Sequence, residues 1–295
     1  MRRRHKLFLI ATLLLAAAVA SSSTFAQSSG SPVAARELKF GFTPVLSERE
    51  MQNEFEPLMT YLSDALGQKV VLYVAKDYGD LRTQMEAGAV DIGSFSPFAY
   101  VDAARGGRIR IIAQSILEGS ATYRGIIVAR KDSGLKTVAD LKGKRFAFVD
   151  PKSASGYLYP RAMLLERGIE PATYFKTTTF AGSHDKVIAA VLAGQADAGS
   201  IYEGALGVAQ RSGVLVENLV TIISTEPIPH DAIAVRLGLD DALVKRIQLA
   251  LINLDQSEAG RRVIAHSKKK LTGHVPAEDS LYDVVRRTAK LAGLE

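Results

Sequence analysis

The chain has 295 residues, of which 47% are hydrophobic and 23% are charged, and its formal net charge is +6. This length and composition suit a folded chain of two domains and exclude a wholly disordered one. Cysteine is absent, which excludes disulfide bonds, thiolate metal sites and cysteine nucleophiles. The basic excess would favour a nucleic-acid partner only if the charges were clustered on the folded part.

The basic excess comes mostly from the N-terminus. Residues 1–6 (MRRRHK) are followed by the uncharged run Leu7–Ala20 and by small residues that end at Ala26. This layout predicts a secretory signal peptide over 1–26 and a flexible leader over 27–36, because a membrane anchor needs about twenty apolar residues. Without the signal peptide the excess of basic over acidic residues falls from six to two, so nucleic acid is not an expected partner.

From residue 37 onward, short apolar runs alternate with segments of helical periodicity, which predicts an α/β fold with largely parallel sheets. The predicted strands are Leu38–Phe42, Val70–Val74, Val90–Gly93, Arg108–Ala113, Arg145–Val149, Phe175–Phe180 and Asp197–Ile201. The predicted helices are Met51–Leu66, Leu81–Ala87, Pro97–Arg105, Tyr157–Arg167, Lys186–Ala193, Glu203–Arg211, Asp240–Leu251 and Tyr282–Leu291.

Two further extended segments, Tyr123–Ala129 and Pro229–Val235, lie about a hundred residues apart. Two such segments are what the insertion of one lobe into another requires. We therefore expect residues 37–125 and 231–295 to form lobe 1 and residues 126–230 to form lobe 2.

Hydroxyl groups and glycine recur where three predicted strands meet the next helix, at Ser94–Pro97, Ser153–Gly156 and Gly182–Asp185. The first turn of a helix has unpaired backbone N–H groups and a partial positive charge. Several such ends at the carboxyl edge of a sheet can bind an anion. Each joint alone is better explained as helix capping by serine or aspartate, and only their repetition favours an anion site.

Other site chemistries find little support. His184 and His230 each precede an aspartate, but no ligand spacing such as His-x-x-x-His occurs, so neither a metal nor a cofactor is expected. Ser133–Lys136 matches a Ser-x-x-Lys pattern without the partner motifs of acylating enzymes. The basic run Lys268–Lys270 is expected to be solvated, since no aromatic residues interleave it.

Six motifs follow one another along the chain. They are Asp91–Pro97 (DIGSFSP), Thr122–Gly125 (TYRG), Val149–Pro160 (VDPKSASGYLYP), Gly182–Asp185 (GSHD), Ala196–Gly199 (ADAG) and Ile228–Ala232 (IPHDA). This ordered set resembles the periplasmic phosphonate- and phosphite-binding proteins of ABC transporters. The likeness covers nearly all of residues 37–295. It implies a type 2 periplasmic binding fold, in which two α/β lobes joined by two crossing strands clamp a ligand between them.

The resemblance also implies which residues bind a phosphorus oxyanion. Carried over by position, they are Phe95, Tyr123, Ser153, Ser155, Ser183, His184, Tyr202 and Asp231. Serines and His184 would donate to the oxyanion, and Asp231 would accept from a protonated oxygen. Ala154 and Phe95 depart from the family, which commonly has Thr or Ser and Tyr there, and each departure removes one side-chain donor.

Together these features predict a periplasmic receptor that delivers a phosphonate, phosphite or related oxyanion to an ABC permease of the inner membrane. Two alternatives stay open. A periplasmic sensor subunit could have the same cleft, and an enzyme on the same fold could use His184 or His230 as a general base, although neither has a nucleophile beside it in sequence.

Overall fold

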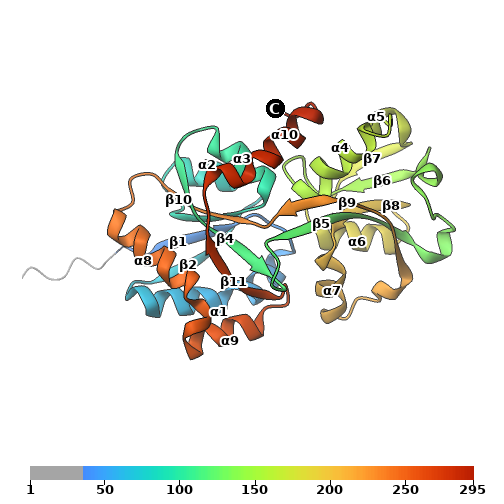
Figure 1. Ribbon diagram of the computed structural model, residues 1–295. Coiled ribbons are helices and arrows are strands. Elements are labelled where there is room, and N and C mark those ends of the chain that lie inside the picture. The colour runs from blue at the N-terminus through green and yellow to red at the C-terminus, as the bar shows by residue number, and fades with distance from the viewer. Residues whose placement is uncertain (1–35) are drawn as a thin grey trace, which may run out of the picture. The chain divides into compact units, whose positions relative to one another are not determined.

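Two β-sheets, each covered by helices, organise residues 36–295, which are the residues that this computed structural model describes (Figure 1). The predicted signal peptide and all but the last residue of the predicted leader lie outside the described residues. We call the first sheet with its helices lobe 1 and the second sheet with its helices lobe 2.

The sheet of lobe 1 has the strand order β11-β4-β10-β3-β1-β2. Its strands are β1 (Leu38–Phe42), β2 (Val70–Val74), β3 (Ile92–Phe95), β4 (Ile109–Leu117), β10 (Ala232–Arg236) and β11 (Leu271–Pro276). The sheet of lobe 2 has the order β7-β6-β8-β5-β9. Its strands are β5 (Thr122–Arg130), β6 (Arg145–Phe148), β7 (Thr177–Phe180), β8 (Ala198–Tyr202) and β9 (Leu219–Pro229).

The prediction of largely parallel sheets is wrong, because both sheets are mixed. Strands joined through a helix are parallel, as in the pairs β1–β2, β1–β3, β6–β7 and β6–β8. The strands that lead into or out of a crossing run the other way, so β10 is antiparallel to β3 and β4, and β5 is antiparallel to β8 and β9. The pairing of β11 with β4 is antiparallel as well.

Within residues 36–295, ten α-helices cover the sheets. They are α1 (Glu48–Leu66), α2 (Asp80–Glu86), α3 (Pro97–Ala104), α8 (Asp241–Ile252), α9 (Glu258–His266) and α10 (Asp283–Leu291) in lobe 1, and α4 (Tyr159–Leu165), α5 (Pro171–Tyr174), α6 (His184–Leu192) and α7 (Gly204–Arg211) in lobe 2. Short helical turns are η1 (Lys131–Ser133), η2 (Val138–Leu141), the π-turn η3 (Ala154–Leu158), η4 (Val216–Asn218), η5 (Leu254–Gln256) and η6 (Asp279–Tyr282). No helix of the described range is long and apolar enough to cross a bilayer. Helices α5 and α9 and strands β9 and β11 were not predicted from the sequence.

Helix α1 shows how local sequence sets an element's ends. Its first turn is capped by Ser47, whose Oγ accepts a hydrogen bond from the Glu50 backbone N–H at 3.4 Å. It ends before Gly67, which has φ of 60°, a left-handed conformation that glycine adopts without a Cβ penalty. Between them, Met51, Leu58 and Leu62 recur at helical spacing and are buried in the core.

Strand β6, inside the sheet of lobe 2, is buried on both faces. On β6, Phe146 and Phe148 share a hydrophobic cluster with Leu164 of α4. Ala147, which lies between them, belongs instead to the cluster that contains Val187 of α6. Because side chains alternate along a strand, this division means that α4 and α6 cover opposite faces, as Figure 1 shows.

The chain passes between the two sheets twice. Thr122 at the start of β5 already pairs with Pro229, so Thr122–Gly125, which the sequence assigned to lobe 1, lie in the sheet of lobe 2. The segment Pro229–Val235 is not one continuous strand. Strand β9 ends at Pro229 and β10 begins at Ala232, which leaves His230 and Asp231 between the sheets.

Asp91 ties three strands of lobe 1 together. Its side chain is only 1% exposed and lies at the start of β3. Its carboxylate accepts hydrogen bonds from Lys39 N on β1 at 3.0 Å and from Arg236 Nε on β10 at 2.8 Å. The Arg236 donor is charged and the Lys39 donor is a backbone N–H. Leaving either of them without an acceptor inside the protein would cost free energy of folding.

Replacing Asp91 by alanine is therefore expected to lower the free energy of unfolding by about 3 kcal/mol. The loss arises because the Arg236 guanidinium and the Lys39 N–H both lose their acceptor. Urea unfolding followed by circular dichroism measures it. Asp241→Ala is the matched control, since the Asp241 side chain is 87% exposed in its pair with Arg110, and it should cost less than about 1 kcal/mol. Equal losses in the two variants would contradict the structural role of Asp91.

Candidate functional site

A small cavity of about 30 Å³ lies between the two lobes. It is lined by Val45, Ser96, Leu117, Tyr123, Ser153, Ser155, His184, Tyr202, His230, Asp231 and Lys269. Six of the eight residues that the resemblance indicated are thus brought together. We call this space the interlobe cavity.

Ser153 and Ser155 bring two buried hydroxyls to the cavity from the start of η3. Ser153 Oγ accepts a hydrogen bond from Gly156 N at 3.0 Å, so this hydroxyl caps the turn and keeps its own hydrogen to donate. Strand β5 can approach this turn because Gly125 has no side chain: a Cβ there would lie 2.8 Å from the Ser155 carbonyl oxygen. Ser153 can therefore cap the turn and, with the same hydroxyl, donate a hydrogen bond into the cavity.

His184 begins α6 and is held in one tautomer. Its Nδ1 accepts a hydrogen bond from the Tyr202 backbone N–H at 3.2 Å, so a neutral ring carries its proton on Nε2. Burial, with a smaller contribution from the nearby Lys269 ammonium, lowers the pKa of His184 to about 3. At neutral pH this imidazole is therefore an uncharged N–H donor.

Two tyrosines add phenolic groups. Burial is the main cause that raises the pKa of Tyr202 and of Tyr123 well above the usual value, so both hydroxyls keep their protons. The Tyr202 hydroxyl is buried and has no hydrogen-bond partner among residues 36–295. Tyr123 stacks on His230, with ring centroids 4.8 Å apart and planes 16° apart. Burial lowers the pKa of His230 to about 4, so it too is neutral at pH 7.

Two of the expected residues do not line the cavity. Phe95 is fully buried in the hydrophobic core of lobe 1, and the adjacent Ser96 reaches the cavity instead. Ser183 is buried at the start of α6, where its hydroxyl donates to the Asp185 carboxylate. Phe95 is the last residue of β3, whereas Ser96 lies just beyond the strand at the N-cap of α3 and lines the cavity from there.

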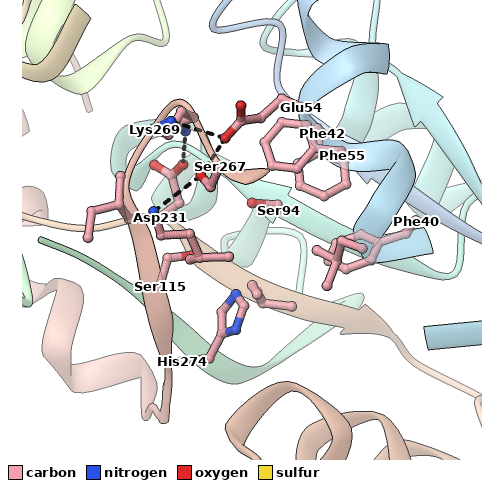
Figure 2. A pocket seen from close by; sticks show the side chains of 14 residues that line it. Phe40, Phe42, Glu54, Phe55, Ser94, Ser115, Asp231, Ser267, Lys269 and His274 are labelled. Carbon is pink, nitrogen blue, oxygen red and sulfur yellow. Dashed lines mark hydrogen bonds and ion pairs between the residues drawn. The ribbon is translucent and has the colours of Figure 1, made fainter. Parts of the chain in front are cut away.

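The prediction that Lys268–Lys270 is a solvated run is wrong for Lys269, whose side chain is only 11% exposed. Its Nζ lies 3.4 Å from Asp231 Oδ2, and the Asp231 side chain is 18% exposed (Figure 2). Three consecutive lysines give no indication in the sequence of which one is buried. The difference arises because α9 and β11, on either side of the run, direct Lys269 inward, whereas Lys270 is exposed.

Contacts between the lobes surround the cavity. Lys152 of lobe 2 pairs with Asp102 of lobe 1 at 2.6 Å. The backbone N–H of His184 donates to the Val45 carbonyl oxygen at 3.2 Å. The Ser47 N–H donates across to Asp185 at 3.2 Å. The two lobes are thus in direct contact, as in a closed binding cleft.

A second small cavity of about 30 Å³ lies inside lobe 1 and shares Leu117, Asp231 and Lys269 with the first (Figure 2). Most of its wall is apolar and includes Phe40, Phe42, Phe55 and Leu58. The ion pair of Asp231 and Lys269 therefore borders both spaces. Among residues 36–295, no group of three His, Asp or Glu side chains is placed to hold a metal ion.

Comparison with known families agrees with this geometry. Residues 40–282 match the model of a family described as the phosphonate periplasmic substrate-binding protein of ABC transporters. The chain belongs to this family. The family indicated by the sequence motifs is therefore confirmed, and membership implies a periplasmic location.

Relatives and solved structures extend the comparison. The phosphate-import protein PhnD of Mycolicibacterium smegmatis is 27% identical over an alignment that covers 100% of this chain and 98% of that protein. The phosphonates-binding periplasmic protein of Escherichia coli is 28% identical, over 78% of this chain and 69% of that protein. The structure of PhnD1 from Prochlorococcus marinus in complex with methylphosphonate has a TM-score of 0.79 and 21% identity, and covers 88% of this chain and 99% of that one. This likeness confirms the predicted type 2 periplasmic binding fold.

Three buried histidines give the protein a defined pH dependence. Burial lowers the pKa of His184 to about 3 and the pKa of His230 and of His274 to about 4. The unfolded chain binds these protons near pH 6.5. Stability is therefore fully present above about pH 6.5 and falls as the pH approaches the folded pKa values, because only the unfolded state takes up the protons.

We expect the free energy of unfolding to decline between about pH 6.5 and pH 5, before most carboxylates titrate. Urea unfolding at a series of pH values measures this decline. His274→Gln, which removes a histidine outside the interlobe cavity, should make the decline shallower. If NMR of the ring protons shows these histidines titrating near pH 6.5 in the folded protein, the expectation is wrong.

Proposed function

We propose that this chain is a non-catalytic receptor that binds a small phosphorus oxyanion in the interlobe cavity and delivers it to an ABC permease. The observation that carries this proposal is the convergence of uncharged donors on one buried space. Ser153, Ser155, His184, Tyr123 and Tyr202 line it, and each has a hydrogen to donate at neutral pH.

Such a set of donors suits a ligand that has several oxygens and a negative charge. Hydrogen bonds to an ionised acceptor are shorter and about twice as strong as neutral ones. Neutral donors hold the anion by dipoles, without a large excess of positive charge in the site. Phosphonate, phosphite and phosphate all have the oxygens required. The name of the M. smegmatis relative supports testing phosphate, and the methylphosphonate in the P. marinus structure supports testing phosphonates.

Family membership supports a receptor over an enzyme, because the family is one of binding proteins for transport. In the proposed cycle, a hinge at the two crossings opens the lobes, and the ligand favours the closed state because it then contacts both. The permease in the inner membrane would recognise that closed state. The layout of residues 1–26 supports export through a cleaved signal peptide. A sensor subunit with the same cavity would differ in its partner, which copurification with the membrane fraction can identify.

Isothermal titration calorimetry of residues 27–295 with methylphosphonate, phosphite, phosphate and sulfate tests the ligand class. We expect saturable heat with at least one phosphorus oxyanion, and sulfate measures the binding of a tetrahedral dianion that has no proton to donate. If no member of the panel gives heat or raises the melting temperature, the oxyanion proposal fails.

Ser155→Ala tests the role of a single donor. Its hydroxyl lines the cavity and caps no helix, so its removal is expected to weaken binding of the best oxyanion by about 1–3 kcal/mol with little change in stability. Ser133→Ala, in the turn η1 outside the cavity, is the matched control and should leave affinity unchanged. Equal affinity in the two variants would show that Ser155 does not contact the ligand.

A further inference from the structure

The electrostatic balance of the interlobe cavity depends on one ion pair. Of the described residues that line it, only Asp231 and Lys269 carry a formal charge at neutral pH. Their charged groups are 3.4 Å apart. His184 and His230 also line the cavity, but their lowered pKa values keep them neutral above pH 5. The net charge of the lining is therefore zero.

The position of Lys269 is built into the fold. The Glu54 carboxylate accepts hydrogen bonds from the Lys269 backbone N–H at 3.1 Å and from Ser267 Oγ at 2.5 Å (Figure 2). It also accepts one from the Lys268 backbone N–H at 2.9 Å. The Lys269 ammonium then lies 5.9 Å from the ring centre of Phe55 and 6.0 Å from that of Tyr202. The face of an aromatic ring attracts a cation that lies within about 6 Å of its centre.

An unpaired Asp231 would limit which ionisation state of the ligand can bind. A carboxylate accepts a hydrogen bond from a singly protonated oxyanion, but it repels a doubly ionised one at close range. A paired ammonium cancels that repulsion, and it can also attract the second negative charge. The preferred ionisation state of the ligand should thus depend on whether Lys269 is present.

We propose that Lys269 is a specificity-determining residue, which by pairing with Asp231 allows the cavity to bind doubly ionised phosphorus oxyanions as well as singly protonated ones. This inference rests on the proposed function. The other titratable groups that face the pair do not change it. Tyr202 and Tyr123 stay protonated, and His184, His230 and His274 stay neutral above pH 5. Glu54 keeps its three donors whether or not the Lys269 side chain is charged.

Calorimetry with methylphosphonate at pH values below and above its second ionisation tests the proposal. We expect the affinity of the wild-type protein to change by less than about threefold, whereas Lys269→Gln should lose at least about tenfold as the pH rises, because its Asp231 is unpaired. Asp231→Asn should show the opposite slope and bind more tightly as the pH rises. Methanesulfonate, which has one negative charge throughout, gives the pH dependence of the protein alone.

Lys270→Gln is the matched control, since Lys270 is exposed and adjacent in sequence, and it should follow the wild-type profile. Melting temperatures show whether each variant is folded. If Lys269→Gln does not fold, Asp231→Asn and Lys269→Arg test the proposal instead. We expect the arginine variant to keep the wild-type pH profile. Parallel pH profiles in wild type and Lys269→Gln, or in wild type and Asp231→Asn, overturn this inference while leaving the receptor function intact. Absence of any oxyanion binding by the wild-type protein instead overturns the proposed function.

Discussion

The second crossing between the lobes is two residues long, and the rest of the site is arranged around it. His230 and Asp231 leave one sheet and enter the other with their backbones hydrogen-bonded at three points. The His230 N–H donates to the Ala121 carbonyl oxygen at 3.0 Å, and the His230 carbonyl oxygen accepts from the Tyr282 hydroxyl at 2.7 Å. The Asp231 carbonyl oxygen accepts from Ser115 N at 3.0 Å. A backbone fixed at three points leaves the two side chains little choice of position, so His230 stacks on Tyr123 and Asp231 faces Lys269.

Burial then decides the chemical state of the groups that meet there. Desolvation disfavours the charged form of each side chain, so it keeps imidazoles neutral and phenols protonated. The same physical effect thus converts titratable residues into fixed hydrogen-bond donors. The two charged groups of the lining, Asp231 and Lys269, lie 3.4 Å apart as an ion pair. The cavity therefore has several hydrogen-bond donors and no net charge on its lining.

Local sequence patterns predicted most of the helices and strands, and the sequence motifs contain most of the residues expected around the cavity. Strands β1 and β2 have the predicted bounds Leu38–Phe42 and Val70–Val74, because alternation and flanking turn residues are local properties. The mixed direction of the sheets was missed, since it depends on which distant strands pair. Lys269 was missed for the same reason. Its burial requires Glu54, 215 residues away, to hold its backbone, and no local pattern contains that contact. Phe95 was carried over by its position in a family motif, but it is buried in the core of lobe 1, and Ser96 at the start of α3 lines the cavity.

The hydrogen bond between His230 and Ala121 joins the two connections of the lobes to each other. A body tethered at a single point can turn about three axes, whereas one held along a line can turn about that line only. The lobes of this protein are held in the second way, so their relative motion reduces to one rotation. Ligand capture and release then follow the same rotation. A partner surface that recognises the angle between the lobes therefore also recognises whether the cavity is filled.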